Sequence, residues 1–396
     1  TSQQNGISQT QVSLRNINLF DIPLSGEGRP GYNPPAELVD AVANATNDSA
    51  VNVLDPDFEI PSEWKYALGA TYTFPDNYIL MTDFMYTVRK NEARIQNIAV
   101  EQVGTMADGR PIYDEREAGR SEDLMLTNLE DDTKAFSFST AISKKFDFGL
   151  SGSLAYAFTE SEDGNPMTSS VAYSNYANFA TDNFNNPSAA TSNYEIPHRF
   201  TLRLTYQKEF FDGLNTTFSL FGSANKGRPY SYVFQTAADQ PAIGGLDIAD
   251  DRQLLYVPDG ANDPNVVFGS NFDQEAFFNW LGESGLGKYA GGTAERNSLY
   301  SSWWHKLDLH ISQELPGLMD GHKASLFFTV DNLTNLINDD WGVMYQAGFP
   351  QYTEVVSAYR NASGQYVFDQ FLDPGIQSRV SGPSLWSARI GFEYKF

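Results

Sequence analysis

Residues 64–90, WKYALGATYTFPDNYILMTDFMYTVRK, contain two segments of alternating polarity that are separated by a Pro-Asp-Asn turn. In the first segment Trp64 and Leu68 fall on one face, and Lys65 and Thr71 fall on the other. Alternation with a period of two residues is the pattern of a β-strand that has two different surroundings. Pro, Asp and Asn are typical of tight connections. The sequence therefore predicts an antiparallel hairpin here.

Segments with this alternation recur along the rest of the chain, although 78–90, 134–145, 214–226 and 322–333 alternate less cleanly than the others. They cover residues 134–145, 149–160, 197–209, 214–226, 303–315, 322–333 and 386–396, and a weaker candidate lies at 11–20. Segments of roughly ten residues suit strands that cross a bilayer at a tilt. Phe and Tyr are abundant, with 28 and 21 residues, whereas charged residues reach only 19%. This composition favours strands over long helices.

The connections between these segments fall into two length classes that alternate along the chain. The short ones follow residues 74, 145, 209 and 315, and the long ones are 21–63, 91–133, 161–196, 227–302 and 334–384. Outer-membrane barrels have short periplasmic turns and long extracellular loops. We therefore predict an all-β, antiparallel transmembrane β-barrel in the bacterial outer membrane, with the final strand ending in the periplasm.

The charge distribution follows the same division. The chain has a net charge of −24, yet the five long loops hold 39 acidic and 11 basic residues, and the remainder sums to +4. A generally acidic proteome would explain the sign of this charge but not its partition. Acidic loops would repel phosphate, so the sequence argues against a nucleic-acid partner.

Composition and spacing argue against an enzyme and against a cofactor or metal site. The chain has no cysteine, and its four histidines are scattered. We expect His198 and His305 to anchor strands at the membrane interface rather than to bind a metal. The run 282–288 imitates a phosphate loop, but Tyr289 stands where Ser or Thr would bind magnesium. Acidic pairs in the loops lack EF-hand spacing and are interpreted as solvated surface.

Two other features of the chain bear on membrane spanning and on the loops. No run of about 18 apolar residues exists, which excludes a transmembrane helix. Residues 272–281 are predicted to form a short helix that begins at Asp273. Its Phe277, Phe278 and Trp280 would either pack the longest loop or face a ligand, and packing is favoured.

Aromatic residues gather at the two ends of the predicted strands. Those expected at the outer level are Trp64, Trp303, Trp304 and Trp386, and those at the periplasmic level include Phe74, Phe210, Phe211, Tyr394 and Phe396. Amphipathic rings concentrate at the headgroup layers of a bilayer. We predict two girdles in contact with outer-membrane lipid and lipopolysaccharide. The alternative is an ordinary core between two packed sheets.

One set of loop residues is a candidate for ligand contact. It consists of Arg228, Tyr230, Tyr232, Phe234 and Tyr256. Aromatic faces beside a guanidinium near a barrel mouth would suit a sugar, a peptide or a metal chelate.

The carboxyl-terminal run SLWSARIGFEYKF, residues 384–396, resembles the closing strand of TonB-dependent outer-membrane transporters. The runs that are similar to the Oar-like subgroup are LDLHISQELP (307–316), VDNLTNLIN (330–338) with Trp341-Gly342, EIPHRF (195–200) and GRPYSY (227–232). The likeness extends from about residue 60 to the end.

The resemblance implies a barrel of about 22 strands that holds a plug domain and carries a periplasmic TonB box. Residues 1–396 would then be the carboxyl-terminal portion of the barrel, with the plug and the box outside this chain. It further implies that TonB energises ligand uptake and that the barrel-assembly machinery recognises Phe396. Some Oar-like members are linked to export or to surface behaviour. The rival readings are a surface adhesion protein that does not transport and a soluble β-rich binding module or lectin.

Overall fold

The computed structural model describes residues 40, 50–249, 251–319, 321–375 and 377–396. Its main sheet contains all nine of the confidently predicted strands, in chain order and antiparallel. They are β2 (Ser62–Thr73), β3 (Tyr78–Lys90), β8 (Thr133–Lys145), β9 (Leu150–Asp163), β11 (His198–Phe211), β12 (Leu214–Asn225), β18 (Trp304–Pro316), β19 (Lys323–Asp331) and β24 (Ser387–Lys395). The predicted strand at 11–20 lies outside the described residues.

The register of the sheet separates an apolar face from a polar one. Along one row of cross-strand partners, Leu68 is followed by Phe84, Phe138 and Phe158. The next row contains Gly69, Asp83, Ser139 and Ala157. The apolar face is open to its surroundings, since Leu68 is 72% and Ile390 76% exposed. Such a face requires lipid rather than water against it.

Within the described residues the sheet is not closed. β2 and β24 each pair with a neighbour on one side only. A spanning sheet cannot leave a row of backbone groups unpaired in lipid, because each unsatisfied group costs several kcal/mol. Closure of the barrel therefore requires a pairing partner for the free edge of each of these two strands.

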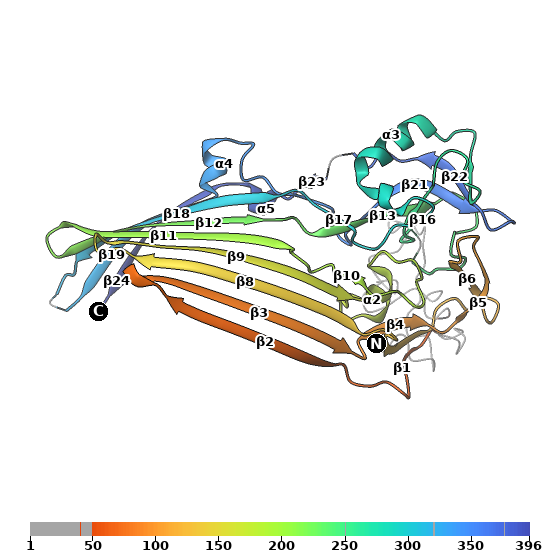
Figure 1. Cartoon of the computed structure of the whole chain (residues 1–396), viewed down its shortest axis with the longest axis horizontal. Helices are drawn as coiled ribbons and strands as arrows, with labels where there is room; N and C mark the ends of the chain where they lie inside the picture. Colours follow the sequence, from red (N-terminus) through yellow and green to blue (C-terminus); the bar gives the residue numbers. More distant parts are fainter. Residues whose placement is uncertain (1–39, 41–49, 250, 320, 376) are drawn as a thin grey trace, which may run out of the picture.

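The predicted division into short and long connections is confirmed. Short turns join the strands at one end, and one of them contains the 3₁₀ turn η3 (Pro75–Asn77). At the other end, the segments between β3 and β8, between β9 and β11, and between β12 and β18 fold together with β21 (Tyr352–Arg360) and β22 (Tyr366–Phe371) into one body (Figure 1). We call this body the head.

The predicted loops thus have secondary structure of their own. In the head and beside it lie β1 (Asn52–Leu54), β4 (Ala93–Asn97), β5 (Val100–Thr105), β6 (Pro111–Glu115), β7 (Leu124–Asn128), α2 (Ala172–Ala177), β10 (Ala190–Thr191), β13 (Pro229–Thr236), β14 (Tyr256–Val257), β15 (Val266–Phe268), α3 (Gln274–Ser284), η4 (Leu286–Tyr289), β16 (Gly292–Thr293) and β17 (Leu299–Tyr300). The last long loop also contains α4 (Leu333–Ile337), β20 (Tyr345–Gln346), β23 (Ser378–Arg379) and α5 (Ser381–Ser384).

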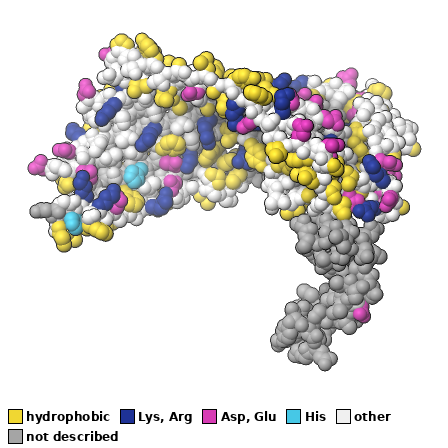
Figure 2. Space-filling model, turned by 90° about the horizontal axis from the view of Figure 1, so that it is seen from below, with side chains coloured by type: hydrophobic (Ala, Val, Ile, Leu, Met, Phe, Trp, Pro, Cys, Tyr) yellow, Lys and Arg dark blue, Asp and Glu magenta, His cyan; other side chains and the backbone are white. Residues whose placement is uncertain are grey.

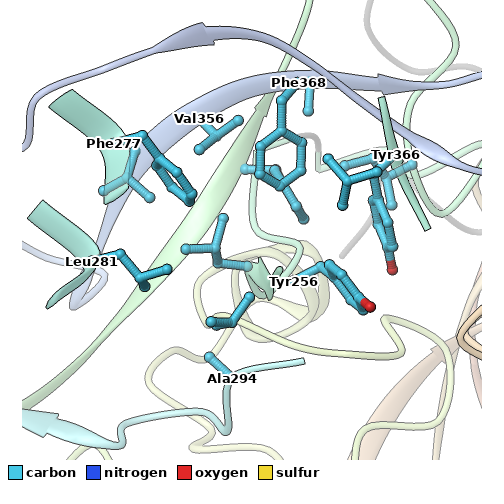
Figure 3. Close-up of a cluster of buried hydrophobic side chains, with 14 of the residues drawn as sticks. Tyr256, Phe277, Leu281, Ala294, Val356, Tyr366 and Phe368 are labelled. Carbon is cyan, nitrogen blue, oxygen red and sulfur yellow. The ribbon is translucent and has the colours of Figure 1, made fainter. Parts of the chain in front are cut away.

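The hydrophobic core of the molecule lies in the head and not in the barrel. A five-stranded sheet in the order β15-β22-β21-β13-β17 combines strands from two long loops. Val356, Tyr366 and Phe368 of this sheet pack together with Tyr256 and with Phe277 of the longest loop (Figure 3). This core joins three of the long loops, and two smaller buried clusters join the loop between β9 and β11 to the loops beside it.

Helix α3 confirms the prediction made for the longest loop. The Asp273 carboxylate accepts a hydrogen bond from the Ala276 backbone N–H at 2.9 Å, and Gly285 ends the helix at a φ of 78°. Phe277 is fully buried, while Phe278 and Trp280 are half-buried against the same core, so the prediction of packing is confirmed as well. Residues 282–288, the run that imitates a phosphate loop, form the end of α3 and the start of η4. No strand directly precedes them.

None of the helices in the described part of the chain has the length and apolar content to cross a membrane.

Candidate functional site

The outer face of the sheet carries aromatic rings at both ends. Trp64, Trp303 and Trp386 are exposed where β2, β18 and β24 begin, on the side of the head. The Trp303 ring also stacks on His198, with 6.0 Å between the ring centroids. Phe74, Phe210, Phe211 and Phe396 are exposed at the opposite end. Tyr394, also at that end, is half-buried and bonds through its hydroxyl to the His322 ring at 2.8 Å.

Trp304 does not share this outer face, so the prediction that it belongs to the girdle is wrong. Its indole Nε1 donates a hydrogen bond to the Gly342 carbonyl at 3.1 Å. The register pairs Trp304 with Asn225, which accepts a bond from Arg199 on the inner face. Adjacent side chains of a strand point to opposite faces, so Trp303 and Trp304 cannot both face lipid.

The inner face of the sheet is polar. Lys306 and Asp308 form an ion pair at 2.9 Å, and the His310 Nδ1 lies 2.9 Å from the Thr329 hydroxyl. Figure 2 shows charged and histidine side chains spread over the underside of the strands. Many of the remaining inner residues are small, among them Ser137, Ser139, Ser153, Ala155, Ala157, Thr201, Thr205, Ser219 and Ser223. A face of this kind suits a hydrated interior.

Three of the five predicted ligand residues keep accessible surface in the head. Arg228 is exposed, and Tyr230 and Tyr232 are half-buried. The two tyrosine hydroxyls are 3.5 Å apart, and the Tyr232 ring lies 5.0 Å from that of Trp280. Burial raises the pKa of the Tyr230 phenol, which therefore stays neutral and able to donate. Together these rings offer stacking edges and hydroxyls at the surface of the head.

Phe234 and Tyr256 are buried in the core of the head, so the prediction that they face a ligand is corrected. The Tyr256 hydroxyl donates to Asp263 at 3.1 Å, and its ring stacks on Tyr366 at 4.8 Å. Burial raises the pKa of Tyr256 to about 12. The loop folds around its own apolar residues, which removes these two rings from the surface.

Sequence reasoning missed the buried arginines of the head. Arg252 has no exposed surface and binds Asp247 at 2.8 Å. Arg110 donates through Nη2 to the Leu254 carbonyl at 2.9 Å and to the Thr293 hydroxyl at 2.7 Å, which joins two long loops. No local pattern distinguishes these arginines from solvated loop residues. Their role depends on partners that are remote in sequence.

Metal binding by clustered side chains is not a feature of the described residues. Among them, no group of three or more His, Cys, Asp or Glu side chains is placed to hold a metal ion.

Comparison with known proteins adds one finding. A family model described as "Outer membrane beta barrel domain" matches residues 1–355. The match includes every strand along the main sheet except β24. No curated protein and no solved structure matches the chain.

Proposed function

Because the chain belongs to the outer membrane beta barrel domain family, we propose that it is the carboxyl-terminal part of a receptor that passes a bound ligand through the membrane. The protein is an all-β barrel protein of the bacterial outer membrane. Within that class we propose a TonB-dependent, Oar-like transporter whose head binds a sugar, a peptide or a metal chelate. It would not be an enzyme.

The observation that carries this proposal is the arrangement of the head above a polar inner face. The head is built around its own core, so its binding groups are held in fixed positions. Below it, the inner face presents Lys306, Asp308 and His310 among side chains that are mostly small or polar. A polar interior is general to outer-membrane barrels, and in the proposed transporter it would form the path that a ligand released from the head follows.

The partners belong to the same proposal. Energy would come from TonB through a part of the protein outside this chain, and the outer aromatic rings would contact lipid and lipopolysaccharide. Phe396 is 97% exposed, so it is available for recognition by the barrel-assembly machinery. Export, or adhesion without transport, is the competing function.

Uptake by cells that produce the full-length protein tests the transport proposal. Labelled oligosaccharides, peptides and ferric chelates are supplied with and without a protonophore, and surface-bound label is separated from accumulated label. We expect accumulation of one class to stop when the proton-motive force is removed while surface binding persists. Binding without any energy-dependent accumulation would identify an adhesion protein instead.

The same assay tests the aromatic ligand surface. Replacing Tyr230 and Tyr232 by Ala removes two rings and two hydroxyls, and we expect surface affinity to fall about tenfold or more. Tyr194→Ala, which removes a ring that is 57% exposed elsewhere, is the matched control. Unchanged affinity in the double variant would exclude these tyrosines from the site.

A further inference from the structure

The last long loop leaves four large apolar side chains exposed. Leu336 and Ile337 belong to α4, Trp341 follows the helix, and Leu385 lies shortly before β24. Ile337 is the most exposed of them, at 65%. We call these four side chains the loop patch. Large apolar side chains that share an exposed surface usually mark a contact with lipid or with another molecule.

Hydrogen bonds connect the two segments that carry the loop patch. Asn332, the cap of α4, donates through Nδ2 to the Gly342 carbonyl at 2.9 Å and to the Pro383 carbonyl at 3.1 Å. The Ser384 hydroxyl accepts from the Met344 backbone N–H at 2.9 Å. Residues 332–344 and 383–385 therefore form one unit at the outer ends of β19 and β24.

The turn around α4 provides partners for its own polar groups. The Asn332 side-chain oxygen accepts from the Thr334 hydroxyl at 2.8 Å. The Asn335 Nδ2 donates to the Asp339 carbonyl at 2.9 Å and to the Trp341 carbonyl at 3.0 Å. A segment that enters a bilayer must bond its backbone internally, because hydrocarbon offers no partner. This turn meets that requirement and still leaves its apolar side chains exposed.

The unit lies on the lipid side of the sheet. Figure 1 shows α4 above β18, beside which it lies, whereas the polar inner face is the underside that Figure 2 shows. On β19, Val330 shares the outer face with Phe328. Val330 is only 2% exposed, although Phe328 is 38% exposed. The outer face is thus covered by protein at the point where α4 begins.

The loop patch is continuous with the surface that faces lipid. Leu385 directly precedes Trp386, and Trp386 and Ile390 are exposed on the outer face of β24. Lipid that covers this face reaches the patch without any other partner. The exposed Asp339 and Asp340 follow α4, and carboxylates stay in the hydrated headgroup layer. They limit the depth of the segment to the interface.

We infer that residues 333–342, together with Leu385, dip into the outer leaflet of the membrane. The aliphatic side chains of the loop patch contact the acyl chains of lipopolysaccharide, and Trp341 lies at the level of the headgroups. Part of the last long loop is then bound to the membrane and not extended into the medium. The inference goes beyond the proposed function, because it holds for a transporter and for an adhesion protein alike.

Spin labels test this position in the purified full-length protein, inserted in vesicles that contain lipopolysaccharide. Residues 1–396 contain no cysteine, so a single introduced cysteine is labelled selectively in this chain, and any cysteine in the rest of the protein is replaced by Ser. The reporter is Ile337→Cys. The matched controls are Ile390→Cys on the lipid face and Ala362→Cys at the exposed turn between β21 and β22.

The measured quantity is the collision rate of the label with oxygen relative to that with a water-soluble nickel complex. Oxygen concentrates in hydrocarbon, so we expect this ratio to be severalfold higher at Ile337 than at Ala362 and close to that at Ile390. A ratio as low as that at Ala362 would place the patch in water and overturn the inference. Few collisions with either reagent would show that protein covers the patch, which also overturns it. Leu336→Cys gives a second reading on the same helix.

Photo-crosslinking in intact cells identifies the molecule that covers the patch. A benzophenone side chain in place of Ile337 should become attached to lipopolysaccharide upon illumination, as should one in place of Ile390. The same side chain in place of Ala362 should not. Attachment at Ile337 to a protein, including a second copy of this chain, without attachment to lipopolysaccharide would contradict the inference.

Discussion

Arg252 is a charged residue with no exposed surface. Its guanidinium is bidentate to Asp247, at 2.8 and 3.2 Å, and it donates to the Tyr176 carbonyl. The cation also lies 4.2 Å from the centre of the Tyr176 ring. These contacts connect the loop after β12 to the loop after β9, so one side chain fixes the relative position of two long loops.

Arg252→Ala should destabilise the head strongly. The change leaves the buried Asp247 carboxylate without its partner, which typically costs about 3–5 kcal/mol. We expect faster hydrogen exchange in peptides of both loops, with exchange in β8 and β9 unchanged. A double variant, Arg252→Met with Asp247→Leu, removes both charges and should recover much of the protection. Parental exchange in the single variant would show that the pair contributes little.

At the level of elements, α3 is attached to the head by its apolar side. Phe277 contacts Phe272, Phe368 and Phe371, with ring centroids 5.3 to 5.8 Å apart. Phe277→Ala should therefore cost about 3–5 kcal/mol, because a large buried ring is removed from a packed core. Asn279→Ala, on the exposed side of the same helix, is the control. Equal thermal midpoints for the two variants, measured by scanning calorimetry, would contradict this account.

The barrel strands could be predicted from sequence because lipid on one face and polar contacts on the other impose an alternation of residue types, clean in some strands and less clean in others. Leu68 and Gly69 show this directly, since they sit side by side in opposite surroundings. The head could not be predicted in this way. Phe234 and Tyr366 meet in its core at 5.6 Å although 131 intervening positions separate them, and no local period encodes such a contact. Only α3 could be predicted from a local signal, namely the Asp273 cap and the run of aromatic residues that follows it.

Over the whole molecule, the long loops are joined by contacts between residues that lie far apart in the sequence. Asp108, from the loop after β3, accepts a hydrogen bond from the Tyr366 hydroxyl at 2.7 Å, and Tyr366 belongs to the last long loop. The candidate site was therefore predicted only in part. Arg228, Tyr230 and Tyr232 keep accessible surface, whereas the core that buries the other two rings forms only when the long loops come together.

The stability of the head should depend on pH, with a sign set by the carboxyl groups of one buried and two half-buried glutamates. Desolvation raises the pKa of Glu92, Glu195 and Glu354 above its ordinary value of 4.5. The folded head then binds more protons than the unfolded chain between pH 4.5 and the raised pKa values. Its stability should rise as the pH falls from neutral into that window. The pKa of Asp55 is lowered instead. Because its ordinary value is 3.8, the effect of Asp55 on stability falls below this pH range.

Hydrogen exchange of the head at pH 5 and pH 7, corrected for the intrinsic rate, measures this dependence. We expect greater protection at pH 5 in the parent protein. Replacing the three carboxyls by Gln fixes each side chain in a neutral form, so the triple variant should lose the pH dependence. In Glu195→Gln the amide oxygen can still accept from the Ser161 backbone N–H, and the amide N–H can donate to the Tyr300 hydroxyl oxygen, so both contacts are kept in a neutral side chain. Equal protection at both pH values in the parent, or the same gain in the triple variant, would mean that these carboxyls do not control the stability of the head.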